Sequence, residues 1–131
     1  MSLPRHSMFQ TWLQASLVVG AAADALLALA LVLLPRQTAD LLGIPLPGEA
    51  FYGWLLALLL LLLSGFYLLA AYDPRAYVGN VMLAVLGRSA GAVVLFLAAG
   101  SAEHLAGLYP AAFAEFGFAV VHAVLFRLSR R

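Results

Sequence analysis

The chain alternates four long apolar stretches with short polar connections. The apolar stretches cover residues 11–34, 51–72, 77–99 and 105–126. Each exceeds the roughly 20 residues that a helix needs to cross the hydrocarbon core of a bilayer. Proline lies in or near each connection, at Pro35, Pro74 and Pro110, where it ends or begins a helix. Because short links join antiparallel neighbours, the pattern predicts an all-α, four-helix transmembrane bundle in a single domain over residues 1–131.

The composition favours an integral membrane protein. Hydrophobic residues make up 65% of the chain and charged residues 10%, with a mean hydropathy of +1.01. A typical soluble domain is about half apolar and one quarter charged. The net charge of +1 argues against nucleic-acid binding, and the lack of cysteine excludes disulfides, reactive thiolates and iron–sulfur ligation. The first apolar stretch is longer than the core of a signal peptide, about 7 to 15 residues, and contains Asp24, so we interpret it as a retained span.

The arginines predict the direction of the spans. In the four-span arrangement only Arg36 falls on one side of the membrane outside the spans. The opposite side receives Arg5, Arg75, Arg127, Arg130 and Arg131. Because short cytoplasmic loops carry the excess of basic residues, we expect both termini in the cytoplasm.

Three charged residues lie in the middle of apolar stretches: Asp24, Arg88 and Glu115. At a rise of about 1.5 Å per residue, each lies about 17–18 Å from the cytoplasmic end of its span, near the bilayer midplane. A lone charge is costly there, so we expect the three side chains to meet, with the Arg88 guanidinium shared between the two carboxylates. Two carboxylates and one guanidinium leave a formal charge of −1, so we expect a proton or a cation to join them. The sequence does not indicate which carboxyl takes the proton.

Helical spacing adds four polar residues to this candidate site. His122 and Asn80 each lie about two turns from the charged residue of their own span, and Ser64 and Tyr67 share one face of the second span. We expect no metal, because no His-x-x-x-His pair occurs, and no cofactor other than a bound lipid or quinone. No residue is assigned a catalytic role. The cluster is interpreted either as a functional centre or as an ion-pair lock that only fixes which helices touch.

Short motifs along most of the chain resemble a known family. They are Leu34-Pro35, Phe51-Tyr52-Gly53, the Asp73-Pro74 turn, Gly87-Arg88 and a Glu in the fourth span. Together they resemble the small bacterial four-helix membrane proteins called DoxX-like. The resemblance implies a location in the bacterial inner membrane and an accessory part in a larger complex, and it carries over no catalytic residue. The lack of cysteine separates this chain from relatives whose roles involve thiols.

From these observations we expect a non-enzymatic accessory or assembly subunit that also holds a lipid or quinone-like amphiphile at the charged cluster. One alternative is a proton-coupled or small-solute transporter in which a carboxyl carries the proton and Arg88 acts as its gate. Another is an intramembrane acid/base enzyme acting on a lipid, with one carboxyl as the acid and His122 as the base. The expected partners are the lipid bilayer and a larger complex or homo-oligomer. We assign the Gly87-x-x-x-Gly91 motif to close packing within the bundle, in preference to dimerisation.

Overall fold

The fold, taken from a computed structural model, is described for residues 8–45 and 48–130. Those residues form helices and connecting turns, and none of them lies in a strand. The elements are α1 (Met8–Leu33), α2 (Pro35–Leu42), α3 (Ala50–Tyr72), α4 (Val78–Ser101), the 3₁₀ helix η1 (Glu103–Leu108) and α5 (Tyr109–Ser129). The all-α class is confirmed, and four helical segments are long and apolar enough to cross a membrane: α1, α3, α4 and η1 with α5.

The boundaries of the predicted spans differ from the helices by a few residues, and one helix was not predicted. The span expected to start at residue 105 begins as a 3₁₀ turn, and regular α-helix starts only at Tyr109, beside Pro110. The connection expected after residue 34 contains α2. Pro35 occupies the first turn of α2, where its missing N–H is not needed and its fixed φ suits a helix.

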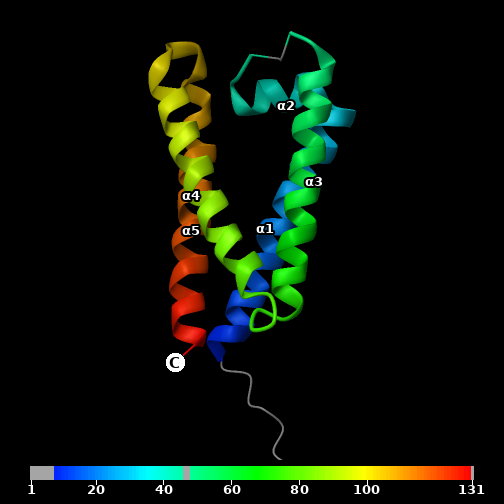
Figure 1. The fold of residues 1–131 in the computed structure, drawn as a ribbon. Helices are drawn as coiled ribbons and strands as arrows, with labels where there is room; N and C mark the ends of the chain where they lie inside the picture. The colour runs from blue at the N-terminus through cyan, green and yellow to red at the C-terminus, as the bar shows by residue number, and fades with distance from the viewer. Residues whose placement is uncertain (1–7, 46–47, 131) are drawn as a thin grey trace, which may run out of the picture.

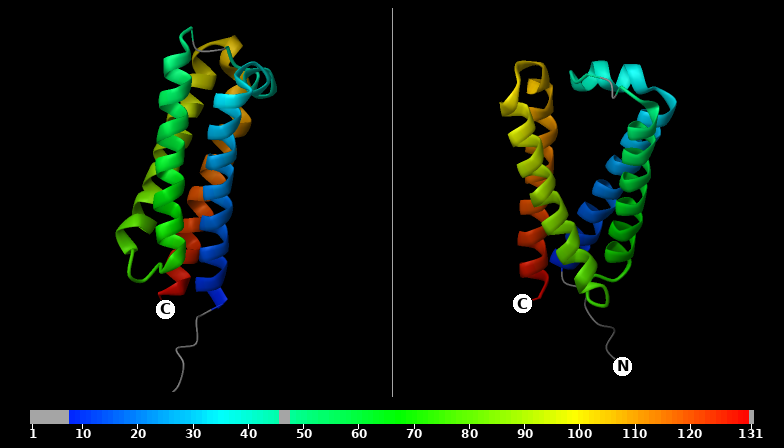
Figure 2. Two further views of the ribbon diagram at one scale, coloured as in Figure 1. Left: turned by 90° about the vertical axis from the view of Figure 1, so that its right-hand side faces the viewer. Right: turned by 45° about the horizontal axis from the view of Figure 1, so that its top comes forward.

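The four long helices form two pairs that spread apart in a V. α1 packs mainly against α3, and α4 against α5, while the most extensive contact between the pairs is that of α1 with α5. The pairs converge at the end that holds the start of α1 and the end of α5, and they diverge towards α2 and η1 (Figure 1 and Figure 2). The convergent end also holds the α3–α4 turn with Arg75, whereas Arg36 lies in α2 at the other end. Arg5 and Arg131, which also entered the orientation argument, lie outside the described residues.

α2 connects the two pairs at the divergent end. Its last turn closes at Gly43, whose φ of +64° favours glycine, and the amides of Gly43 and Ile44 donate to the carbonyls of Asp40 and Ala39. The backbone there lies directly against η1. A Cβ placed on Gly107 would stand 2.3 Å from the Leu42 carbonyl oxygen, so no larger residue fits without movement. We refer to this backbone contact between α2 and η1 as the glycine bridge.

Small residues and two hydrogen bonds, one of them buried, hold α1 against α3. The Ser64 hydroxyl donates to the Ala21 carbonyl at 2.6 Å, and the Gln14 amide donates to the Ala71 carbonyl at 2.9 Å. Alanine dominates the core at this interface, as is usual where helices approach closely inside a membrane. The outward leucines of α3, among them Leu58 and Leu62, are about half exposed. An apolar surface of this extent is typical of helices that face lipid.

The α3–α4 turn lies at Asp73-Pro74, where the sequence predicts a turn. The Asp73 carboxylate accepts hydrogen bonds from the backbone amides of Arg75 and Ala76, at 3.0 and 3.1 Å. A side chain that bonds to amides two and three residues further on is a common way to fix a tight turn. The turn therefore joins α3 to an antiparallel α4 and places Arg75 at the convergent end of the molecule.

Candidate functional site

The three charged residues of the apolar stretches meet at Arg88, as the sequence predicts. Nη2 of Arg88 donates to Oδ2 of Asp24 at 2.9 Å and to the Gly20 carbonyl oxygen at 3.1 Å. Nη1 donates to Oε1 of Glu115. The guanidinium thus binds one carboxylate from α1 and one from α5, and only 3% of its side-chain surface is exposed.

Two aromatic rings contact the same guanidinium. Cζ of Arg88 lies 4.9 Å from the ring centroid of Tyr67 in α3 and 4.9 Å from that of Phe118 in α5. A guanidinium over a ring face is attracted by the ring quadrupole, more strongly when water is excluded. Arg88, itself in α4, therefore contacts each of the other three long helices, and it does so in the convergent half of the V.

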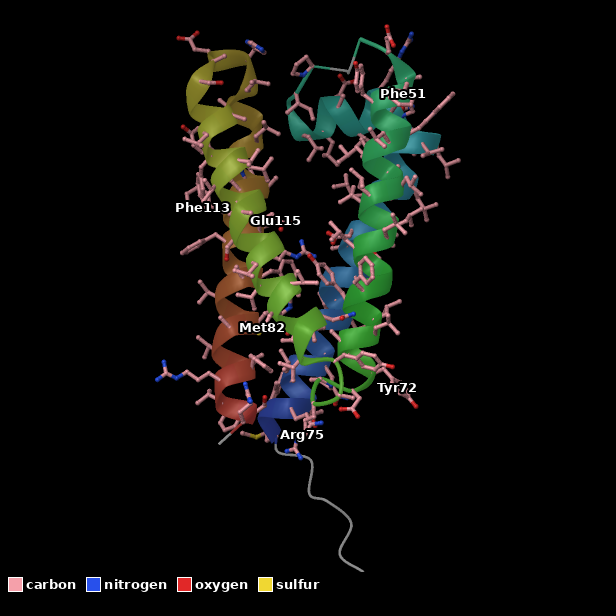
Figure 3. All side chains as sticks on the ribbon, in the orientation of Figure 1. Phe51, Tyr72, Arg75, Met82, Phe113 and Glu115 are labelled. Carbon is pink, nitrogen blue, oxygen red and sulfur yellow. The ribbon has the colours of Figure 1, made fainter. Side chains whose placement is uncertain are left out.

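The two carboxylates differ in exposure. The Asp24 side chain is 8% exposed and the Glu115 side chain 25% exposed. Glu115 lies between the two helix pairs, close to the level at which they begin to diverge (Figure 3). Its second oxygen faces Gly91 of α4, where an added Cβ would lie 3.7 Å away. Asp24 is thus enclosed by protein, whereas Glu115 is bound by Arg88 on one side and left partly open on the other.

Gly20 and Phe118 belong to the site, although sequence analysis did not select them. A Cβ at Gly20 would lie 3.1 Å from Nη2 of Arg88, so the glycine allows the guanidinium to reach the α1 backbone. A signal was present, because Gly20 lies one helical turn before Asp24 and Phe118 lies three residues after Glu115. A small residue one turn from a buried charge marks a place where a long side chain can approach.

His122 lies beside the charged cluster without an ion pair. The side chain is fully buried, with its ring centroid 5.8 Å from that of Phe118. Within the described part of the chain, neither ring nitrogen makes a hydrogen bond of normal geometry. The nearby polar group of α1 is the backbone of Ser16. In residues 8–45 and 48–130 no hydrogen bond joins His122 to Glu115.

The remaining predicted residues have different surroundings. Tyr67 contributes its ring to the cluster through Arg88. Ser64 bonds the α1 backbone, and Asn80 donates to the Phe66 carbonyl at 3.4 Å, so both connect helices and neither binds a charged side chain. The glycines of the Gly87-x-x-x-Gly91 motif face groups of the same bundle, since a Cβ at Gly87 would lie 3.9 Å from the Tyr67 hydroxyl.

Comparison with known proteins gives no match. No protein-family model, curated protein or solved structure is similar to the chain. The resemblance to DoxX-like proteins therefore stays a prediction, and the function has to be argued from the site itself.

The charges of the site limit what it can bind. Asp24 and Arg88 neutralise each other in an enclosed pair, which leaves the carboxylate of Glu115 as the partly open, formally negative group. A carboxylate accepts hydrogen bonds and attracts cations, and it repels anions. The complementary ligand therefore carries a hydroxyl, an amine or another donor next to an apolar body.

Proposed function

We propose that this chain is a non-enzymatic, multi-pass membrane subunit that holds the polar head of a lipid or quinone-like amphiphile at Glu115 and Arg88. The observation that carries the proposal is the 25% exposure of the Glu115 side chain at a point where the surrounding surface is apolar. An exposed carboxylate within hydrocarbon is costly, so a donor group that covers it is favoured. A quinol hydroxyl, or the hydroxyl or amine of a lipid head, has the required chemistry.

The arrangement of the cluster supports a binding role over a purely structural one. A structural lock needs only the enclosed pair of Asp24 and Arg88, whose exposed fractions are 8% and 3%. The second carboxylate adds negative charge without being enclosed. The rings of Tyr67 and Phe118 hold the guanidinium in place, and the guanidinium in turn holds the Glu115 carboxylate. A fixed acceptor lowers the ordering cost of binding a ligand. The apolar tail of the ligand would lie on the same helix surfaces that face lipid.

The proposed cellular setting follows from the arginines and from the family resemblance. Arg75, Arg127 and Arg130 gather at the convergent end, and Arg36 lies at the opposite end. Under the positive-inside rule the convergent end would face the cytoplasm. A DoxX-like identity would add a bacterial inner membrane and an accessory or assembly role in a larger complex or homo-oligomer.

A proton-coupled or small-solute transporter is the second candidate. It is favoured by the same formal charge of −1, since a proton taken up by the partly exposed Glu115 would neutralise the cluster. A proton-coupled transporter would show pH-dependent flux in liposomes that disappears in Glu115→Gln.

The test of the binding function is the amphiphile retained by the full chain after purification in mild detergent. Extracted small molecules are quantified by mass spectrometry for the unchanged chain, for Glu115→Gln and for Glu103→Gln, an exposed glutamate of η1 that serves as the matched control. Loss of one charge-assisted hydrogen bond, about 1.5–3 kcal/mol, should lower retention about 10- to 100-fold in Glu115→Gln and leave the control unchanged.

Two outcomes would contradict the proposal. If no stoichiometric amphiphile is present in any sample, or if Glu115→Gln retains as much as the unchanged chain, the site does not bind through Glu115. A loss of thermal stability without a loss of ligand would instead identify the cluster as an ion-pair lock.

A further inference from the structure

A pocket of about 430 Å³ lies at the convergent end of the molecule, away from the charged cluster. It is formed by the start of α1, the α3–α4 turn and the end of α5. Its lining includes Arg75, Arg130, Gln10, Ser129, Phe126 and Val78. The volume falls within the range of about 300–1,000 Å³ typical of small-molecule sites.

In the part of the chain that the structure describes, the two arginines of this pocket have no acidic partner. Within residues 8–45 and 48–130 the ion pairs are those of Arg88, so no carboxylate lies within 4.0 Å of the guanidinium of Arg75 or Arg130. The neighbouring Asp73 is used by backbone amides of the turn. The Arg130 guanidinium lies over the ring of Phe126, 5.4 Å from its centroid. The pocket therefore holds two positive charges that no described carboxylate pairs with, next to apolar side chains.

We propose that this pocket binds the phosphodiester head group of an anionic glycerophospholipid. Guanidinium groups match phosphate oxygens in two-point hydrogen bonds, and basic pockets between membrane helices at this depth bind lipid head groups. The Ser129 hydroxyl already donates to the Phe126 carbonyl at 2.8 Å, so its oxygen is left to accept a hydrogen bond from a ligand. An acceptor beside two guanidiniums suits a phosphate that carries a hydroxylated group, such as phosphoglycerol.

The surroundings of the pocket favour a lipid over a soluble anion. The pocket lies at the ends of the membrane-length helices, which is the level of the lipid head groups. Val78 lines the pocket. Met82 and Leu86 follow at one-turn intervals on the same face of α4, and their exposed fractions are 53% and 60%. Figure 3 shows Met82 further along α4 from the turn that holds Arg75. An acyl chain attached to the bound head group can lie along this apolar strip. The site is separate from the one at Glu115, and the inference does not depend on the proposed function.

The experiment is a lipid titration of the full chain in mild detergent at about 0.15 M salt, followed by native mass spectrometry. The ligands are short-chain phosphatidylglycerol, phosphatidylcholine with the same acyl chains, and inorganic phosphate. One variant combines Arg75→Gln with Arg130→Gln. The control is Arg127→Gln, which changes an exposed arginine of α5 outside the pocket. The salt screens exposed charges that do not touch the ligand, because the Debye length is then about 8 Å.

The expected result is one preferentially bound phosphatidylglycerol, with affinity about 30-fold lower in the double variant and within about threefold of the unchanged value in Arg127→Gln. Equal binding of phosphatidylcholine, or an equal loss in Arg127→Gln, would overturn the proposal by showing that no specific head-group site exists. Inorganic phosphate that displaces phosphatidylglycerol at equal concentration would overturn the lipid assignment in favour of a soluble anion. Unchanged melting temperatures of all variants will show that these differences do not arise from unfolding.

Discussion

Replacing Gly20 by alanine tests the geometry of the charged cluster with a single added methyl group. That methyl carbon would lie 3.1 Å from Nη2 of Arg88, 3.7 Å from Cε1 of His122 and 3.8 Å from Cε1 of Phe118. The guanidinium cannot retreat easily, because its two Nη atoms also bind carboxylates and the Gly20 carbonyl. Overpacking of a tight site costs about 1–3 kcal/mol.

A matched control removes the effect of helix propensity. Alanine in place of glycine within a helix gains about 0.5–1 kcal/mol on its own. Gly117 in α5 and Gly65 in α3 are interior helix positions with nothing within 4 Å of an added Cβ. The difference in unfolding free energy between Gly20→Ala and Gly117→Ala therefore reports the clash alone, and we expect Gly20→Ala to be less stable by about 1–3 kcal/mol.

The assay is reversible unfolding in mixed micelles with increasing denaturing detergent, followed by circular dichroism. Gly65→Ala and Gly117→Ala should be as stable as the unchanged chain or slightly more stable. If Gly20→Ala behaves as they do, then the guanidinium does not lie against the α1 backbone, and the described cluster is wrong.

Three further predictions concern the contacts between helices. Ser64→Ala removes the hydrogen bond from α3 to α1 and should cost about 0.6–1.7 kcal/mol in the same assay, whereas Ser89→Ala, which loses only a bond to its own helix, should change little. Arg88→Met leaves two carboxylates without a cation and should cost about 3–5 kcal/mol, and neutralising both carboxylates in the same chain should restore most of that stability. Gly107→Ala should break the glycine bridge and increase the α2–η1 distance between spin labels on introduced cysteines, while Gly79→Ala, with open space around it, should not. An unchanged distance in Gly107→Ala would contradict the described bridge.

The sequence predicts the spans and the meeting of the charges for simple physical reasons. Each apolar stretch has the length that a helix needs to cross a bilayer, and α1, α3, α4 and α5 lie within a few residues of these stretches. The helical rise places Asp24, Arg88 and Glu115 at one height, and the cost of a lone charge in hydrocarbon then requires them to meet. The structure brings them together in the predicted way.

Other features depend on tertiary packing and were not predictable from the sequence. The residues of α2 form a short polar segment between prolines, and its helix is held by burial of Thr38 and Ala39 against the rest of the molecule. The pairing of α1 with α3 rests on Gln14 and Ser64 reaching carbonyls of the opposite helix. Carbonyls are present at every residue, so the sequence cannot indicate which one a side chain will find.

The distribution of charge between the two helix pairs has a consequence for how the chain enters the membrane. Each pair is a hairpin of successive helices, and the second hairpin contains Glu115 together with its cation, Arg88. The first hairpin contains Asp24, and its partner Arg88 lies in α4, the third of the four long helices. If the spans insert in the order of the sequence, Asp24 would enter the lipid before Arg88, and docking of the two hairpins would give this carboxyl its counter-charge.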